Sequence, residues 1–293
     1  MTDFYCMHRW KKVLRWVLIG LLLLPLLGML AMEGVDRYLA SDRGAKWFYR
    51  KVPASVTVLH TDNGLRYLEI GDPALPALLL LHGSPGGLFD WRSMAVDSAV
   101  TGRFRLLVVE RPGYGGTKPR GAEPSIRAQA SRCLEVLARE KQPVVLMGYS
   151  YGAPVAMAMA GLAPNRITGV VGVSGQYNPN DEMILRISPF LRWGVFRFLM
   201  PRMLWVSNEE KMNHFAALEE VLPLFDNVQA PILLLHGDAD AIVPYDNSPW
   251  LAERLGGKPR VVTLPGVDHG VPFGHMDVLV NVVLTLPSAE GRP

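Results

Sequence analysis

Short apolar runs alternate with helix-like stretches through most of the chain beyond Pro53. The runs at 55–60 and 65–70 flank an Asp-Asn-Gly turn at 62–64, which predicts a β-hairpin. Such near-continuous apolar runs are typical of strands that are buried on both faces of a parallel sheet. Six further runs have this character and the length of a strand: 77–81, 105–109, 144–147, 167–173, 232–235 and 260–264.

Helical patterning occupies the intervals between these runs. The alternation of strand-like and helix-like segments predicts an α/β fold in which helices cover both faces of the sheet. From Ser174 to Pro231 no convincing strand occurs, and residues of about 176–230 are predicted to form a short helical lid over a site. The stretches with helical patterning are 123–139, 151–162, 248–255 and 273–286.

Within this lid, the segment 183–205 combines aromatic and methionine side chains with arginines at intervals. If the segment covers a site, the side chains of Phe190, Trp193 and Phe196 are expected to select the groups that fit there. Two alternatives stay open: the same side chains could face a lipid bilayer, or the segment could be a pair of ordinary packing helices.

An uncharged apolar stretch of 17 residues occupies 16–32, close to the N-terminus. As a helix it would span roughly 25 Å, and the three residues at 13–15 extend it to the length of a membrane-spanning helix. We therefore expect a single-pass membrane anchor at 1–32, a linker at 33–54 and a catalytic domain at 55–293. A cleaved signal peptide is the main alternative. A typical cleavage site has small residues two positions apart, and Ala31 would need a small residue at position 29, which is Met29.

The location of charge indicates the orientation of this anchor. Residues 1–32 hold four of the 30 basic residues and one of the 27 acids, so the rest of the chain holds 26 of each. Basic residues before the apolar stretch favour a cytoplasmic N-terminus with the catalytic domain on the non-cytoplasmic side. The body has no net charge and therefore lacks the positive surface expected of a nucleic-acid-binding protein. The two cysteines, Cys6 and Cys133, are too few for a disulfide framework and lack the spacing of metal ligands.

The strongest chemical signal is the G-x-S-x-G motif at 148–152, centred on Ser150. It lies directly after a strand-like run and directly before a helix-like one, which is the context of a nucleophile on a sharp, strained turn. Glycines on either side are needed because larger side chains would collide with the neighbouring strand and helix. The helix N-terminus behind Ser150 would stabilise a developing oxyanion.

A serine nucleophile needs a histidine base and an acid that orients the base. The acid is expected in the loop after 232–235, where Asp240 and Asp238 are both candidates. Two histidines follow the last strand-like run. His269 lies in the loop directly after that run and is favoured as the base, whereas His275 falls inside the next helical pattern.

The oxyanion hole requires backbone N–H donors. One is expected from Tyr151, the residue after the nucleophile. The second is expected from Ser84 in the loop 82–87, because Pro85 has no N–H to donate and Gly83 allows the backbone to approach a substrate closely.

Together these motifs resemble the α/β-hydrolase fold superfamily in order and spacing over about residues 55–290. The resemblance implies an eight-stranded, mostly parallel sheet, a lid after the sixth strand, Asp240 rather than Asp238 as the acid, and no metal or cofactor. The first two loops look like those of the proline iminopeptidase and small-ester hydrolase branches. The matching segments are HGSPGG (82–87), ERPGYGGT (110–117), GYSYG (148–152), HGDADAIVP (236–244) and GVDHG (266–270).

The expected function is hydrolysis of a carboxylic ester through Ser150, His269 and Asp240, with Ser84 and Tyr151 as oxyanion donors. A serine at 150 excludes the relatives that use an aspartate nucleophile, such as epoxide hydrolases. The expected substrate is a small apolar ester, which could be lipid-derived because of the membrane anchor. The alternatives are a peptidase or amidase of the proline iminopeptidase type, and a catalytically silent binding protein tethered to the membrane.

Overall fold

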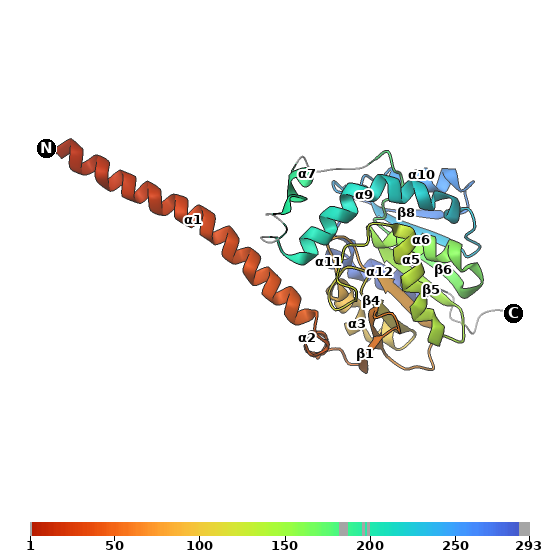
Figure 1. The fold of residues 1–293 in the computed structure, drawn as a ribbon. Helices are drawn as coiled ribbons and strands as arrows, with labels where there is room; N and C mark the ends of the chain where they lie inside the picture. The colour runs from red at the N-terminus through yellow and green to blue at the C-terminus, as the bar shows by residue number, and fades with distance from the viewer. Residues whose placement is uncertain (1, 182–186, 195–196, 198–199, 287–293) are drawn as a thin grey trace.

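Eight strands form one sheet in the order β1-β2-β4-β3-β5-β6-β7-β8, in a computed structural model that describes residues 2–181, 187–194, 197 and 200–286 (Figure 1). The β1/β2 hairpin and the β2/β4 pair are antiparallel, and the other pairs are parallel. Each strand-like run in the sequence is therefore confirmed as a strand. The strands are β1 (Val56–His60), β2 (Arg66–Ile70), β3 (Ala77–Leu81), β4 (Arg105–Val109), β5 (Val144–Tyr149), β6 (Ile167–Val173), β7 (Ile232–Gly237) and β8 (Arg260–Leu264).

Helices cover both faces of the sheet. The longer ones are α5 (Ile126–Cys133), α6 (Gly152–Leu162), α9 (Arg202–Phe225), α10 (Asn247–Arg254) and α12 (Met276–Thr285). The helix expected over 123–139 begins as α5 and continues as the 3₁₀ helix η2 (Leu134–Arg139). Shorter helices are α2 (Asp42–Phe48), η1 (Leu88–Trp91), α3 (Arg92–Val96), α4 (Ser98–Thr101), η3 (Pro164–Arg166), α7 (Ser188–Leu191) and α11 (Val271–Gly274).

Two hydrophobic cores lie on opposite faces of the sheet. Alternate residues of β3 divide between them, with Leu79 in the core under α5 and α6 and Leu78 in the core under α3 and α12. Both leucines are fully buried. The continuous apolar runs in the sequence are explained by this arrangement, because every side chain of a central strand enters one core or the other.

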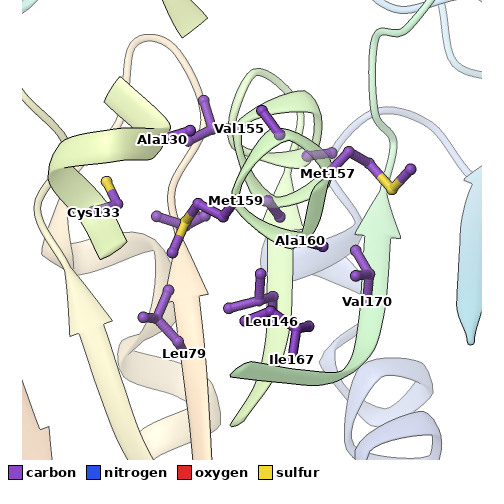
Figure 2. Close-up of a cluster of buried hydrophobic side chains, with 14 of the residues drawn as sticks. Leu79, Ala130, Cys133, Leu146, Val155, Met157, Met159, Ala160, Ile167 and Val170 are labelled. Carbon is purple, nitrogen blue, oxygen red and sulfur yellow. The ribbon is translucent and has the colours of Figure 1, made fainter. Parts of the chain in front are cut away.

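Helix α6 lies especially close to the sheet (Figure 2). Met157, Met159 and Ala160 belong to the same buried core as Leu146 of β5 and Val170 of β6, and in the figure Ala160 lies over these two residues while Met159 extends toward Leu79 of β3. The small residues along α6 allow this approach, and every residue from Gly152 to Gly161 is buried. The helix behind the nucleophile is thus held rigidly against the centre of the sheet.

The N-terminal helix α1 (Thr2–Leu39) projects away from the body (Figure 1). Its part Lys12–Leu39 is long and apolar enough to cross a membrane, and no residue of its most apolar stretch is buried. The end of α1 is secured by Arg66, whose guanidinium donates hydrogen bonds to the carbonyls of Leu39 (2.9 Å) and Ala40 (2.8 Å) and pairs with Glu110. The linker expected at 33–54 contains the last turns of α1 and the helix α2.

Candidate active site

Ser150 occupies the turn between β5 and α6 in a left-handed conformation, with φ of 51°. This conformation destabilises the folded state by about 1–3 kcal/mol when the residue is not glycine, and such residues cluster at functional sites. The flanking glycines make the turn possible. A Cβ on Gly148 would collide with the carbonyl oxygen of Gly152, and a Cβ on Gly152 would lie 2.5 Å from the carbonyl oxygen of Leu81.

His269 lies in the loop between β8 and α11 and faces Ser150. Its Nε2 is 3.0 Å from the Ser150 Oγ, and its Nδ1 is 2.7 Å from the Asp240 Oδ2. Tyr149 supports this position because its hydroxyl donates a hydrogen bond to the His269 carbonyl (3.0 Å) and its ring packs beside the imidazole. The motif gave no sign of this role for Tyr149, although the residue lies within G-x-S-x-G.

Asp240 is buried in the loop after β7. Its Oδ1 accepts hydrogen bonds from the backbone N–H groups of Ile242 and Val243, both at 2.9 Å, and its Oδ2 faces His269. His236 Nε2 lies 3.3 Å from the same Oδ2. Burial raises the pKa of the Asp240 carboxyl, but hydrogen bonds from His236, His269 and Val243 outweigh it and hold the pKa below its usual range. Asp240 is therefore ionised near neutral pH.

The two competing candidates lie elsewhere. Asp238 is exposed and accepts a hydrogen bond from the N–H of Gly266 at 2.6 Å. His275 lies at the start of α12, with its backbone as the N-cap. The structure brings Asp240 and His269 to Ser150 and places neither Asp238 nor His275 in the hydrogen-bond chain that leads to it.

The loop after β3 lies directly against Ser150. A Cβ on Gly83 would be 3.1 Å from the Tyr149 ring and 3.3 Å from the Ser150 Cβ, so a larger residue here would require these side chains to shift. Ser84 and Tyr151 line the same cavity as Ser150. The Ser84 hydroxyl is 3.0 Å from the hydroxyls of both Tyr114 and Ser207. The two residues expected to supply oxyanion donors therefore stand beside the serine.

Arg111 holds this loop in place from the interior of the protein. Its side chain is fully buried and donates hydrogen bonds to the carbonyls of His82 (2.9 Å) and Gly83 (2.7 Å). Its Nη1 also lies 2.6 Å from the Glu210 carboxylate of α9. Burial lowers the pKa of Arg111, but the Glu210 carboxylate more than offsets this and raises it.

Asp90 is a second buried carboxyl beneath the same loop. Its Oδ2 accepts a hydrogen bond from the N–H of Gly83 at 3.3 Å, whereas its Oδ1 has no partner among the described residues. Burial raises the pKa of Asp90 to about 7, and the Gly83 N–H and the charge of Arg111 offset only part of that rise. The loop is therefore supported by the buried Arg111–Glu210 ion pair and by the buried Asp90 carboxyl, whose pKa is near 7.

A cavity of about 480 Å³ opens above Ser150. Helix α9 contributes polar side chains to it, among them Ser207, Lys211 and His214. The His214 ring stacks on the Tyr151 ring at 4.6 Å, and Lys211 donates a hydrogen bond to Gln176. The apolar part of the described lining consists of Pro85, Leu191, Met200, Leu204, Ile242, Val243 and Phe273.

Lys211 and His214 were not among the site residues expected from the sequence motifs. Positions 204, 207, 208 and 211 follow helical spacing and all line the cavity, so the spacing of residues on one face of α9 could have revealed them.

Of the aromatic residues expected over the site, the two that the structure describes do not line the cavity. Phe190 and Trp193 are 53% and 61% exposed and lie outside the cavity lining, while Phe196 is outside the described residues. Their neighbour Leu191 lines the cavity instead.

Comparisons with known proteins agree with this architecture. A model of the alpha/beta hydrolase family matches residues 78–282. The uncharacterized protein Rv2307c of Mycobacterium tuberculosis is 26% identical over 227 residues, which is 73% of this chain and 72% of the relative. Epoxide hydrolase B of M. tuberculosis is 32% identical over 120 residues, which is 39% of this chain and 33% of the relative.

Solved structures share the fold at low sequence identity. The carboxylesterase CesB of Bacillus subtilis superposes with a TM-score of 0.63 at 18% identity, covering 86% of this chain and 97% of its own. A bacterial membrane phospholipase A superposes with a TM-score of 0.57 at 20% identity, covering 98% of this chain and 100% of its own. At these identities the likeness shows the fold and singles out no branch.

Proposed function

Because the chain belongs to the alpha/beta hydrolase family, we propose that it is a serine hydrolase that cleaves carboxylic esters with apolar acyl groups. The observation that carries this proposal is the continuous hydrogen-bond chain from the Ser150 Oγ through His269 to Asp240, at 3.0 and 2.7 Å. The left-handed backbone at Ser150 supports it, because the fold maintains a strained conformation where a nucleophile would be exposed.

In this mechanism the Ser150 Oγ attacks the ester carbonyl while the His269 Nε2 takes the hydroxyl proton. Asp240 holds the imidazole in the required tautomer and stabilises the imidazolium that forms. The imidazolium then returns the proton to the leaving alcohol, and an acyl-enzyme remains on Ser150. A water molecule, deprotonated by His269, attacks the acyl carbonyl and releases the acid and the free serine.

The negative charge of the tetrahedral intermediate develops on the former carbonyl oxygen. We assign the backbone N–H groups of Ser84 and Tyr151 as its donors, because both residues line the cavity beside Ser150. Arg111 acts as a positioning residue in this assignment. It binds the carbonyls of His82 and Gly83 and so sets the direction of the following N–H.

The cavity lining supports an apolar acyl group. Its exposed area is mainly apolar, and its described lining contains Lys211 but no acidic side chain. An aminopeptidase needs a carboxylate to bind the substrate's free ammonium group, and Lys211 would repel that group instead. An ester therefore fits this cavity better than the amino terminus of a peptide.

A lipid-derived ester is the substrate class that the wider architecture favours. The apolar helix α1 is exposed and long enough to hold the body at a bilayer. The membrane phospholipase A superposes over almost the whole chain, α1 included. We propose that residues 1–32 anchor the protein as a single-pass membrane protein, that residues 55–293 form the catalytic domain on the non-cytoplasmic side, and that residues of about 176–230 form its lid.

Fluorophosphonate labelling and a series of p-nitrophenyl esters of increasing chain length test the function on the full chain in detergent. Labelling and hydrolysis should both disappear in Ser150→Ala and both persist in Ser207→Ala, which removes another hydroxyl from the same cavity. An intact chain that reacts with neither reagent would favour a silent binding protein. Cleavage of a prolyl arylamide in preference to every ester would favour the peptidase.

A further inference from the structure

A second cavity of about 330 Å³ lies between the N-terminal helix α1 and the start of α9. Figure 1 shows the beginning of α9 on the side of the body that faces α1. We call this space the arginine cavity, because four arginines contribute to its wall: Arg37 from α1, Arg120 from the loop after β4, and Arg197 and Arg202 from the segment between β6 and β7.

Two acids balance only part of this positive charge. Glu33 pairs with Arg37 at 2.6 Å and accepts a hydrogen bond from the backbone N–H of Arg202 at 2.9 Å. Asp36 lies 3.9 Å from the Arg202 guanidinium. The cavity with its neighbouring acids thus carries four arginines against two carboxylates, a formal excess of two positive charges.

Arg120 and Arg197 supply this excess. Neither forms an ion pair within the part of the chain that the structure describes, and both are exposed. The Arg197 guanidinium is 4.6 Å from the centre of the Trp205 ring, so its position is held by an aromatic face. A guanidinium held in this way keeps its N–H donors available for an anion, and arginine suits phosphate because its planar fork can bind two oxygens at once.

The cavity lies where the apolar part of α1 ends. Met29 and Leu30 line one side of it, and Glu33 and Arg37 follow within the next two turns of the same helix. If α1 spans a bilayer, as proposed above, this transition falls at the level of the lipid headgroups. The hydrogen bonds from Arg66 to the end of α1 keep the helix and the body in this arrangement.

The arginine cavity also adjoins the cavity above Ser150, because Met200 lines both. A molecule with its anionic group among the arginines would have its apolar part next to the proposed acyl cavity. We propose that the arginine cavity binds the phosphate group of an anionic phosphate ester and holds it beside the catalytic cavity. This inference rests on the proposed anchoring of α1. The phosphate could come from a membrane glycerophospholipid or from a soluble ester.

Native mass spectrometry of the full chain in a neutral detergent tests this proposal. The Ser150→Ala background prevents consumption of the lipid, and phosphatidylglycerol is titrated against zwitterionic phosphatidylcholine. The chain should prefer phosphatidylglycerol. The double variant Arg120→Gln/Arg197→Gln should weaken phosphatidylglycerol binding by about fivefold for each arginine removed and leave phosphatidylcholine binding unchanged.

A matched control removes two positive charges at the other end of the apolar stretch. Lys12→Gln/Arg15→Gln should keep the preference for phosphatidylglycerol. Competition with glycerol 1-phosphate then separates the two sources. Displacement of the lipid by low concentrations of this soluble ester identifies a soluble ligand, and persistence of the lipid identifies the headgroup. Equal binding of both lipids, or an equal loss in both double variants, would overturn the proposal.

The proposed function and this inference can be refuted independently of each other. Selective phosphatidylglycerol binding by a chain whose wild-type form cleaves no p-nitrophenyl ester would support the arginine cavity and refute the esterase. Ester cleavage by a chain that binds both lipids equally would refute the arginine cavity and leave the esterase in place.

Discussion

Arg111 and Glu210 lie 99 positions apart in the chain and form an ion pair of 2.6 Å in which both side chains are fully buried. Arg111 follows β4, and Glu210 lies in the middle of α9. Through this pair the helix that covers the cavity is tied to the loop that carries the proposed oxyanion donor. Tyr114 joins the same cluster, because its hydroxyl donates to Glu210 at 2.6 Å.

Replacing Glu210 with Ala should destabilise the protein strongly, because it leaves the Arg111 charge buried without a partner. The expected loss is about 3–5 kcal/mol in the free energy of unfolding. Glu210→Gln should be milder because it keeps the hydrogen-bonding shape. Its kcat for a short ester should fall more than its KM changes, since the loop beside Ser150 loses support. Unfolding midpoints and steady-state kinetics check both, and an unchanged midpoint for Glu210→Ala would contradict the structural role.

Matched substitutions test the proposed base and acid. His269→Gln and Asp240→Asn should each reduce kcat by about three to four orders of magnitude, because the nucleophile, base and orienting acid act as a unit. The controls His275→Gln and Asp238→Asn remove the same groups from neighbouring positions and should retain most of the activity. An inactive His275 variant beside an active His269 variant would reverse our assignment of the base.

Asp90 should make stability depend on pH in a specific direction. Its folded pKa of about 7 lies above the unfolded value near 3.8, so between these values the folded state binds more protons than the unfolded state. Asp90 therefore costs stability progressively as pH rises from about 4 to 7, by up to about 4 kcal/mol in total.

The variant Asp90→Asn removes this titration and can still accept the hydrogen bond from the Gly83 N–H. The free energy of unfolding of this variant, relative to that of the wild type, should increase as pH is raised from 4.5 to 8. Thermal unfolding of both proteins across this range measures the difference. Parallel pH profiles for the two proteins would show that Asp90 does not titrate as we expect.

The two sides of the proposed lid should respond differently to substitution. Leu204 lines the cavity, so Leu204→Ala should shift the preferred acyl chain of soluble esters toward longer chains, in graded steps of about 1–3 kcal/mol per methylene. Phe190 and Trp193 are exposed, so Phe190→Ser/Trp193→Ser should leave that preference unchanged and reduce hydrolysis of a phospholipid in vesicles. A shifted chain-length optimum in the double variant would place these aromatics at the site after all.

The apolar helix α1 should hold the full chain in the membrane fraction. High salt should not extract it, because an apolar span is not held by charge, whereas detergent should. N-terminal sequencing of the purified protein should find the residues before Trp16. A mature chain that begins near residue 32 would instead identify the segment as a cleaved signal peptide.

The sequence determined much of this architecture by itself. All eight strands and the turn at Ser150 followed from apolar runs and from glycine positions, because a central strand and a sharp strand-to-helix turn depend on local chemistry. The order of motifs along the chain also placed the candidate residues Asp240 and His269 in loops at the ends of β7 and β8, where parallel strands bring their carboxyl ends together.

Only the tertiary structure decided which distant groups meet. Arg111 and Glu210, Lys211 at the cavity wall, and Arg197 beside α1 belong to segments whose local patterns contain no sign of one another. The outward direction of Phe190 and Trp193 was equally undetermined, since an aromatic on a short helix can face a cavity or solvent with the same local pattern. Such contacts depend on how α9 packs over the body and how the end of α1 lies against α9, and packing and charge burial across the whole fold set both arrangements.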